Sequence, residues 1–152
     1  MDIIIAEERP DTPDAMQLIE ELEGELVPLY PDESRHGYNI EKLLKQNVAF
    51  FVTRKDGSAA GCGGIQLFDK EYGELKRMYV RPSYRGLGLA TLMLENLAGH
   101  AVENGVHLLR LETGIHQHHA IALYESWGFQ KISAFGEYKQ DPLSLFYEKA
   151  IP

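Results

Sequence analysis

The chain has 152 residues, of which 44% are hydrophobic and 25% charged, and its formal net charge at pH 7 is −8. A chain of this length and composition folds as one globular domain, here residues 1–152, whose core needs no disulfide or metal. The acidic balance argues against a nucleic-acid partner, and no long apolar run or basic leader indicates a membrane or secreted protein, so we expect a cytoplasmic one.

Cys62 is the only cysteine, which excludes an internal disulfide and fits a reducing compartment. It lies in the Gly-rich apolar stretch 59–65, which is typical of a strand interior. No helix start or adjacent base is apparent that would lower the pKa of the thiol. We therefore expect a small buried side chain rather than a nucleophile.

The first part of the chain predicts a strand at 2–6 and a helix that ends near residue 26. Asp11-Thr12-Pro13 supplies a cap and an N1 proline for this helix. Its acidic residues are most simply a solvated face; they include Glu20, Glu21, Glu23 and Glu25. A polar loop at 29–37 and a short helix at 39–44 follow.

Three strands at 47–54, 58–68 and 74–80 then predict an antiparallel meander. The first two are joined at Lys55-Asp56-Gly57, a hairpin signal in which Gly takes a positive φ. The third strand, residues 74–80, ends directly before the glycine-rich segment that follows.

The second half begins with the clearest helix, at 86–104, where apolar residues recur at helical spacing and Gly105 supplies a C-terminal cap. The strand at 106–113 completes a βαβ unit, so strands 74–80 and 106–113 are expected to be parallel. A helix at 117–127, strands at 129–134 and 143–149, and a loop at 136–142 complete the chain.

The segment between strand 74–80 and the long helix has the properties of an anion site. Its backbone turns through Gly86 and Gly88 into a helix start, where unpaired N–H groups and the positive end of the helix dipole coincide. Basic residues cluster nearby, and an anionic ligand fits there; they are Lys76, Arg77, Arg81 and Arg85. We expect Arg81 and Arg85 to add charge at its rim.

Two nucleotide-binding patterns do not fit this segment. A P-loop needs Lys followed by Ser or Thr after its last glycine, whereas Gly88 is followed by Leu89 and Ala90. A dinucleotide fingerprint needs a third glycine where this chain has Thr91, and it begins a fold rather than following several elements. Neither ATP nor a nicotinamide cofactor is therefore indicated.

The segment instead resembles the acyl-CoA signature of the GNAT superfamily of N-acyltransferases, in which Gln or Arg precedes Gly by three residues and Gly or Ala by five. Arg85, Gly88 and Ala90 match it. A second block, residues 120–129, is similar to the family's later helix, which ends in Tyr, three residues and Gly-Phe, here Tyr124 and Gly128-Phe129. The resemblance implies an α+β fold with a mixed, mostly antiparallel sheet of about six to seven strands flanked by helices, and a parallel βαβ unit at the acyl-CoA site.

The resemblance also implies the cofactor site. Backbone amides from Leu87 to Thr91 would hold the CoA pyrophosphate, Arg85 would neutralise it, and main-chain groups of strand 74–80 would bind the pantetheine arm. The residues expected to bind acetyl-CoA are Met78, Tyr79, Val80, Arg85, Gly86, Leu87, Gly88, Leu89, Ala90, Thr91, Gln117 and Tyr124. The family usually has Asn at the position of Gln117, so the contact of this side chain with the pantetheine differs from the family pattern.

The implied activity is transfer of an acetyl group from acetyl-CoA to a primary amine of a small molecule or peptide, by direct attack in a ternary complex. Tyr124 matches the family's proton donor to sulfur, and Glu74 lies where the family often has a general base. The rival bases or substrate contacts are Glu33, His36, His107 and Glu112. The family resemblance leaves the acceptor open, and dimerisation is common among its members.

Two other interpretations are weaker. His116, His118 and His119 are close in sequence, but their spacing fits no recognised ligand set, so no metal is expected. A non-catalytic acyl-CoA-binding module would keep the loop from Arg85 to Ala90 without needing Tyr124 or a base. Retention of both blocks favours the enzyme.

Overall fold

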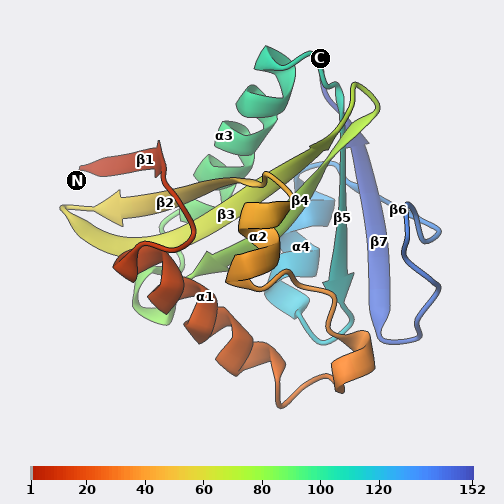
Figure 1. The fold of residues 1–152 in the computed structure, drawn as a ribbon, viewed down its shortest axis with the longest axis horizontal. Helices are drawn as coiled ribbons and strands as arrows, with labels where there is room; N and C mark the ends of the chain where they lie inside the picture. Colours follow the sequence, from red (N-terminus) through yellow and green to blue (C-terminus); the bar gives the residue numbers. More distant parts are fainter. Residues whose placement is uncertain (1) are drawn as a thin grey trace.

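A computed structural model describes residues 2–152, and over these residues a seven-stranded sheet is flanked by helices (Figure 1). The strands are β1 (Ile3–Glu7), β2 (Ala49–Lys55), β3 (Ser58–Phe68), β4 (Tyr72–Val80), β5 (Leu108–Gly114), β6 (Gln130–Ile132) and β7 (Ser144–Ala150). The helices are α1 (Pro13–Leu26), α2 (Ile40–Lys45), α3 (Leu89–Glu103) and α4 (His118–Ser126), with 3-10 turns η1 (Asp32–Ser34) and η2 (Pro82–Tyr84). No helix among the described residues has both the length and the apolar character to cross a membrane.

The fold predicted from the sequence is confirmed. The strands lie in the order β1-β2-β3-β4-β5-β7-β6, and every adjacent pair is antiparallel except β4 and β5, which are parallel. The long helix begins three residues later than expected, at Leu89, because Gly86 and Gly88 have φ of 82° and 80° and continue the loop. Thr12 caps α1 as predicted by accepting a hydrogen bond from the Ala15 N–H.

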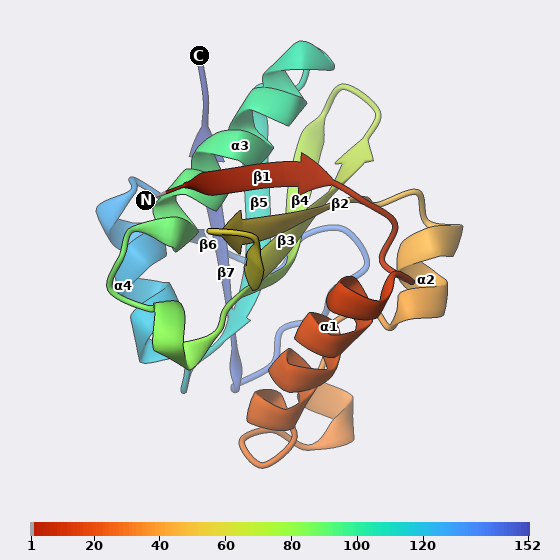
Figure 2. The same cartoon turned by 90° about the vertical axis from the view of Figure 1, so that its left-hand side faces the viewer.

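Helices cover both faces of the sheet. α1 and α2 lie on one face and α3 and α4 on the other, as the two perpendicular views show (Figures 1 and 2). Each face has its own buried cluster. Leu18 and Leu22 of α1 belong to the same cluster as Leu43 of α2, and Leu94 and Leu97 of α3 belong to the other. Burial of these apolar side chains holds the sheet between two layers of helices.

The middle of the sheet opens where β4 and β5 part. The two strands pair only at Gly73 with Leu109 and at Glu74 with Arg110. Beyond Glu74, β4 stays paired with β3 as far as Val80, but its other edge has no strand partner. Main-chain groups of residues 76–80 that point away from β3 therefore have no strand partner among the described residues and face the space between β4 and β5.

A bulge in β4 lies at this opening and was not predicted from the sequence. Between Lys76 and Tyr79 the strand has one residue more than β3 opposite, and Arg77 takes a positive φ of 53°. Contacts hold this residue in place: its Nε donates to the Tyr38 carbonyl oxygen at 2.8 Å, and its guanidinium pairs with Glu23. A positive φ is uncommon for a residue with a side chain, so these contacts stabilise a conformation that the chain alone disfavours.

Candidate active site

A groove of about 620 Å³ lies along the end of β4, between the glycine loop and α4; it is called the large groove below. Most of the residues predicted to bind acyl-CoA line it: Met78, Tyr79, Val80, Arg85, Gly86, Gly88, Leu89, Ala90, Thr91, Gln117 and Tyr124. Leu87 is not among the described lining residues, and its side chain is exposed. Residues from β4, the glycine loop and α4 are thus brought to one surface.

The glycine loop at the head of α3 offers backbone rather than side-chain groups. A Cβ added at Gly86 or Gly88 would meet nothing within 4 Å, so glycine is needed here for its positive φ rather than for packing. Gly88 is the cap residue and has no side chain to satisfy the first N–H groups of α3. These donors and the helix dipole face open space that an anion can fill.

The four basic residues near the glycine loop do not form the free cationic cluster that the sequence indicated. All four of its cations are paired with glutamates: Lys76 with Glu74, Arg77 with Glu23, Arg81 with Glu21 and Arg85 with Glu25. The interpretation of α1's acidic residues as a solvated face was therefore wrong for Glu21 and Glu23, which are partly buried in these pairs, whereas Glu25 is paired but exposed. These pairs depend on tertiary packing, because α1 lies beside β4 and its carboxylates align with the arginines.

Of these cations, Arg85 is the one placed to meet an anion in the large groove. Its Nη2 lies 2.8 Å from Glu25 Oε1 and its Nε donates to the Val80 carbonyl oxygen at 2.9 Å. Arg85 and Glu25 both line the groove, and their side chains are 45% and 42% exposed. Arg81 donates to Glu21 and to the Ala59 carbonyl oxygen, and it is not among the described residues that line the groove.

A second cavity of about 90 Å³ adjoins the large groove and is called the small pocket. The two cavities share Leu22, Leu26, Met78, Gln117 and Tyr124. The remaining lining residues of the small pocket are Tyr30, Ser34, Arg35, His36, Gly37, Leu75, Lys76, Arg77, Leu111, Glu112, Thr113 and Gly114. A group in the small pocket would therefore reach the large groove at Met78 and Tyr124.

Tyr124 stands at this junction. It is buried, and its ring meets Phe129 edge-on with centroids 5.7 Å apart. Burial, with a smaller contribution from the Glu112 carboxylate, raises the pKa of its phenol well above the usual value of about 10. Tyr124 therefore stays protonated and acts as a hydrogen-bond donor at neutral pH.

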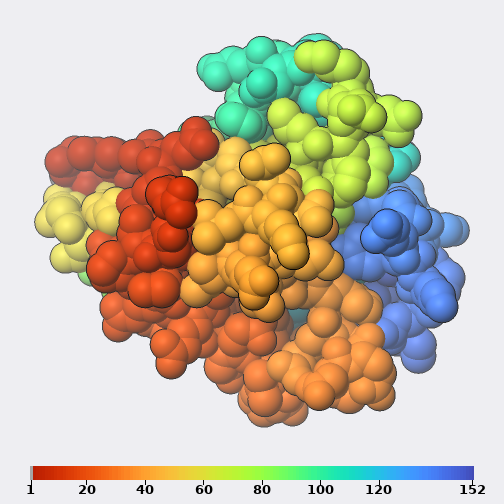
Figure 3. Space-filling view, in the orientation of Figure 1, coloured from red at the N-terminus to blue at the C-terminus, as the bar shows by residue number. Residues whose placement is uncertain are grey.

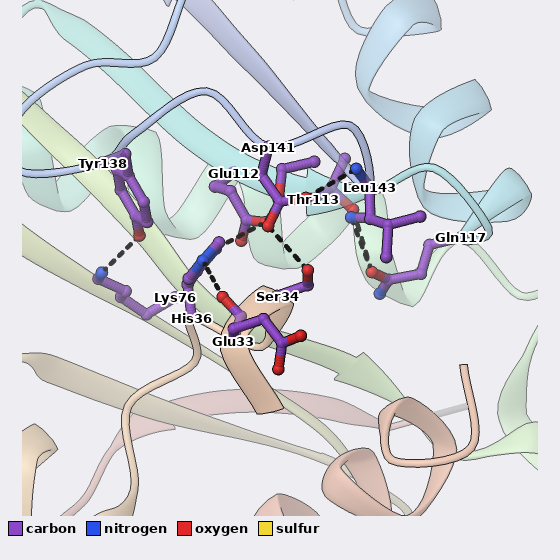
Figure 4. Close-up of polar contacts among 12 residues, drawn as sticks. Glu33, Ser34, His36, Lys76, Glu112, Thr113, Gln117, Tyr138, Asp141 and Leu143 are labelled. Atoms are coloured by element: carbon purple, nitrogen blue, oxygen red, sulfur yellow. Dashed lines mark hydrogen bonds and ion pairs between the residues drawn. The ribbon is translucent and has the colours of Figure 1, made fainter. Parts of the chain in front are cut away.

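His36 and Glu112 form a polar pair in the wall of the small pocket (Figure 4). Glu112 Oε2 lies 3.3 Å from His36 Nδ1 and accepts a hydrogen bond from Ser144 Oγ at 2.8 Å. His36 Nε2 lies 3.1 Å from the Glu33 carbonyl oxygen, which can only accept, so Nε2 carries a hydrogen. The contact between Nδ1 and Glu112 Oε2 is then a hydrogen bond when one of these two atoms carries a proton.

Burial raises the pKa of Glu112, while His36 and Ser144 oppose this effect. A carboxyl with a raised pKa, paired with a histidine and facing a cavity, is typical of acid–base chemistry. The set of rival bases indicated by the sequence thus becomes smaller, since His107 bonds the Ile151 carbonyl oxygen and is not among the described lining residues of either cavity.

Glu74 is held away from both cavities. Its carboxylate pairs with Lys76 Nζ at 2.8 Å and accepts a hydrogen bond from the Tyr138 hydroxyl, all three groups being largely buried. It is not among the described residues that line the large groove or the small pocket. Lys76, by contrast, lines the small pocket, and its Nζ lies 3.8 Å from the centre of the Tyr38 ring.

The loop after α1 lines the small pocket, and hydrogen bonds tie it to two distant parts of the chain. Ser34 Oγ donates to Asp141 Oδ2 at 2.8 Å, and the Tyr30 hydroxyl accepts from the His116 N–H at 3.0 Å. Figure 3 shows the orange segment near residue 30 lying against blue C-terminal residues. These contacts join the loop after α1 to the turn between β5 and α4 and to the segment before β7.

The remaining candidates have simpler environments. Cys62 is buried, and burial raises the pKa of its thiol to about 12, so it is neutral at pH 7, in keeping with the packing role expected for it. His116, His118 and His119 are exposed and line the large groove. Gln117 Oε1 accepts from the Gly114 N–H at 3.0 Å, so its side chain caps the turn into α4.

Comparison with known proteins agrees with this geometry. A relative from Azospirillum brasilense, named IAA acetyltransferase, is 44% identical over 98% of both chains. A solved structure from Klebsiella pneumoniae, assigned to the acyl-CoA N-acyltransferases, is 39% identical and superposes with a TM-score of 0.84 over 98% of this chain and 97% of that one. A GNAT acetyltransferase from Elizabethkingia anophelis with acetyl-CoA bound shares the fold, with a TM-score of 0.73 over 98% of both chains at 17% identity.

The family assignment itself comes from the pattern of the whole domain. Residues 13–129 match the Acetyltransferase (GNAT) family, a span that runs from the start of α1 to the end of the Tyr124 block. The chain therefore belongs to the GNAT family of acetyltransferases.

Proposed function

We propose that the protein transfers an acetyl group from acetyl-CoA, bound in the large groove, to a primary amine of a small molecule or peptide that enters the small pocket. The observation that carries this proposal is that the two cavities meet at Met78 and Tyr124. Both reactants then approach each other directly, and the reaction needs no covalent enzyme intermediate. When bound, acetyl-CoA supplies an acetyl group already activated as a thioester.

On the donor side, the free N–H groups at the head of α3 and the Arg85 guanidinium bind the pyrophosphate. The unpaired edge of β4, at residues 76–80, binds the amide groups of the pantetheine arm as an added strand would. The Met78 N–H is assigned to the carbonyl oxygen, where negative charge develops during attack.

At the junction, the amine nitrogen bonds to the acetyl carbon and the carbon–sulfur bond breaks. Tyr124 donates its phenol hydrogen bond to the departing sulfur. The ordinary pKa of a phenol, about 10, already lies above that of a typical thiol, near 8.5, and burial raises the pKa of Tyr124 further, so the phenol stabilises the thiolate mainly as a hydrogen-bond donor.

The His36–Glu112 pair is assigned to remove the proton from the amine. Glu112 lines the small pocket, whereas the carboxylate of Glu74, the base expected from the sequence, is held by Lys76 and Tyr138. Glu74 remains the second candidate for the base and is tested together with Glu112.

The assignment is tested first with the unmodified protein. Acetyl-CoA, but not ATP or NAD, is expected to raise the melting temperature, because a ligand that binds the folded state stabilises it. Free thiol is then measured with a panel of amino acids, polyamines, aminoglycosides and peptides. Stabilisation by acetyl-CoA with no thiol release from any amine would show a binding module instead of an enzyme.

Glu25→Gln is expected to tighten acetyl-CoA binding about twofold to fivefold. Glu25 competes with the pyrophosphate for Arg85, and an exposed ion pair of this kind is worth up to about 1 kcal/mol. Calorimetric titration of acetyl-CoA measures the effect, and Glu20→Gln on the same helix controls for the change in net charge. Equal affinities for the two variants would mean that Arg85 does not meet the phosphates.

Tyr124→Phe is expected to lower kcat about tenfold or more and to leave the affinity for acetyl-CoA nearly unchanged, because the lost hydrogen bond forms only as the thiolate develops. Steady-state kinetics and calorimetry separate the two effects. Tyr147→Phe is the matched control, since Tyr147 is also buried and its hydroxyl bonds Glu125 at 2.8 Å, away from both cavities. An unchanged kcat would remove Tyr124 from the mechanism.

Glu112→Gln is expected to abolish the acidic limb of the pH profile. In the native protein kcat/KM should rise with pH as Glu112 loses its proton, and this limb should lie above the ordinary carboxyl range because burial raises its pKa. The variant should be about a hundredfold slower, with no such limb, while exposed Glu71→Gln behaves as the native protein. If Glu74→Gln loses the limb and Glu112→Gln keeps it, Glu74 is the base.

A further inference from the structure

The small pocket carries a charge pattern that the overall acidity of the protein does not suggest. Arg35, Lys76 and Arg77 line it, whereas Glu112 is the one carboxylate among its described lining residues. If this cavity receives the acceptor, as the proposed function requires, the far end of the acceptor lies beside these cations. A net charge of −8 for the chain therefore says little about the acceptor's charge.

Two of the three cations are firmly neutralised. Lys76 Nζ lies 2.8 Å from Glu74, and both side chains are about 5% exposed or less. Arg77, with a side chain 3% exposed, pairs with Glu23 and donates to the Tyr38 carbonyl oxygen. Both cations are thus fixed by buried partners and contribute little free charge to the cavity.

Arg35 is different because its partners are weak. It shares Glu23 with Arg77, at a longer distance of 3.6 Å, and its other partner, Asp32, has a side chain that is 90% exposed to solvent. Solvent screens an exposed pair strongly, so Asp32 offsets only part of the guanidinium charge. Arg35 is the least compensated cation of the small pocket.

Arg35 also has an unused donor. Its Nε is buried and has no hydrogen-bond partner among the described residues, although buried polar groups are almost always paired. The side chain as a whole is 22% exposed and lines the pocket, so the guanidinium lies in the pocket wall; a carboxylate would reach its edge, formed by the covered Nε and by Nη2, by replacing the exposed Asp32. A carboxylate is the acceptor that best fits such an edge, since it accepts two parallel N–H groups.

We propose that the acceptor is an amine that also carries a carboxylate, as a free amino acid does, and that Arg35 binds this carboxylate. The inference rests on the proposed function and adds the chemical class of the acceptor to it. Arg35 then orients the substrate with its amine toward Met78 and Tyr124. A polyamine is disfavoured, because its second ammonium group would face an incompletely neutralised guanidinium.

The first test uses the unmodified protein and matched acceptors. Thiol release is measured for free amino acids, for their carboxamides and for the amines left when the carboxylate is removed, together with diamines. We expect kcat/KM for the best amino acid to exceed that of its carboxamide and of its decarboxylated amine by at least about tenfold, the usual loss when a charged hydrogen bond is removed.

The second test changes Arg35. Arg35→Gln should raise KM for amino acids about tenfold or more, should leave the rate with carboxamides within about twofold, and should not change acetyl-CoA affinity. Arg35→Lys should recover part of the loss, because lysine keeps the charge without the two-pronged geometry. Arg9→Gln, at an exposed arginine paired with Asp11, is the matched control.

The outcomes separate this inference from the proposed function. Carboxamides or diamines acetylated as well as amino acids would leave acetyl transfer standing and overturn the carboxylate site. An equal loss on amino acids and carboxamides in Arg35→Gln would show that Arg35 only holds the loop, and would also overturn it. If no amine releases thiol, the proposed transfer fails and this inference falls with it.

Discussion

The site depends on one departure from regular pairing, namely that β4 and β5 pair at only two positions and then separate. A continuous ladder would use the N–H and C=O groups of residues 76–80 within the sheet, leaving none for a ligand. The gap also lets Tyr124 of α4 and Glu112 of β5 face cavities that join. The bulge at Arg77 adds a residue to β4 at this point, and α1 and the Tyr38 loop hold it there through Glu23 and a carbonyl oxygen.

The ionic contacts of α1 change how anion binding at the groove is understood. Glu21, Glu23 and Glu25 lie along one stretch of the helix and pair with three arginines that follow one another in the chain: Arg77, Arg81 and Arg85. These pairs fasten α1 to β4 and to the glycine loop, and they leave little free side-chain charge at the mouth of the groove. Attraction for phosphate therefore rests first on the backbone N–H groups and dipole of α3, with Arg85 adding charge once it leaves Glu25.

The parts of the site that depend on a few neighbouring residues could be predicted from the sequence. The glycine turn that leads into a helix and the position of Tyr124 before Gly128 follow from short stretches of sequence, although α3 begins at Leu89, three residues later than expected. Contacts between residues far apart in the chain could not be predicted from such short stretches. His36 and Glu112 are 76 residues apart, and the burial of Glu74 depends on Tyr138, 64 residues further on. Alternation along a strand shows which residues share a face, but a bulge such as that at Arg77 changes the faces without any clear sequence signal.

The two groups assigned to proton handling also influence each other. Burial is the main cause of the raised pKa of Tyr124, and the Glu112 carboxylate adds a smaller contribution while it is charged. Once Glu112 has taken the proton of the amine, that contribution disappears and the phenol becomes a stronger donor. In the proposed reaction this change occurs as the thiolate forms beside Tyr124. If the proposed roles hold, removal of the amine proton and stabilisation of the leaving group are coupled through the charge of Glu112.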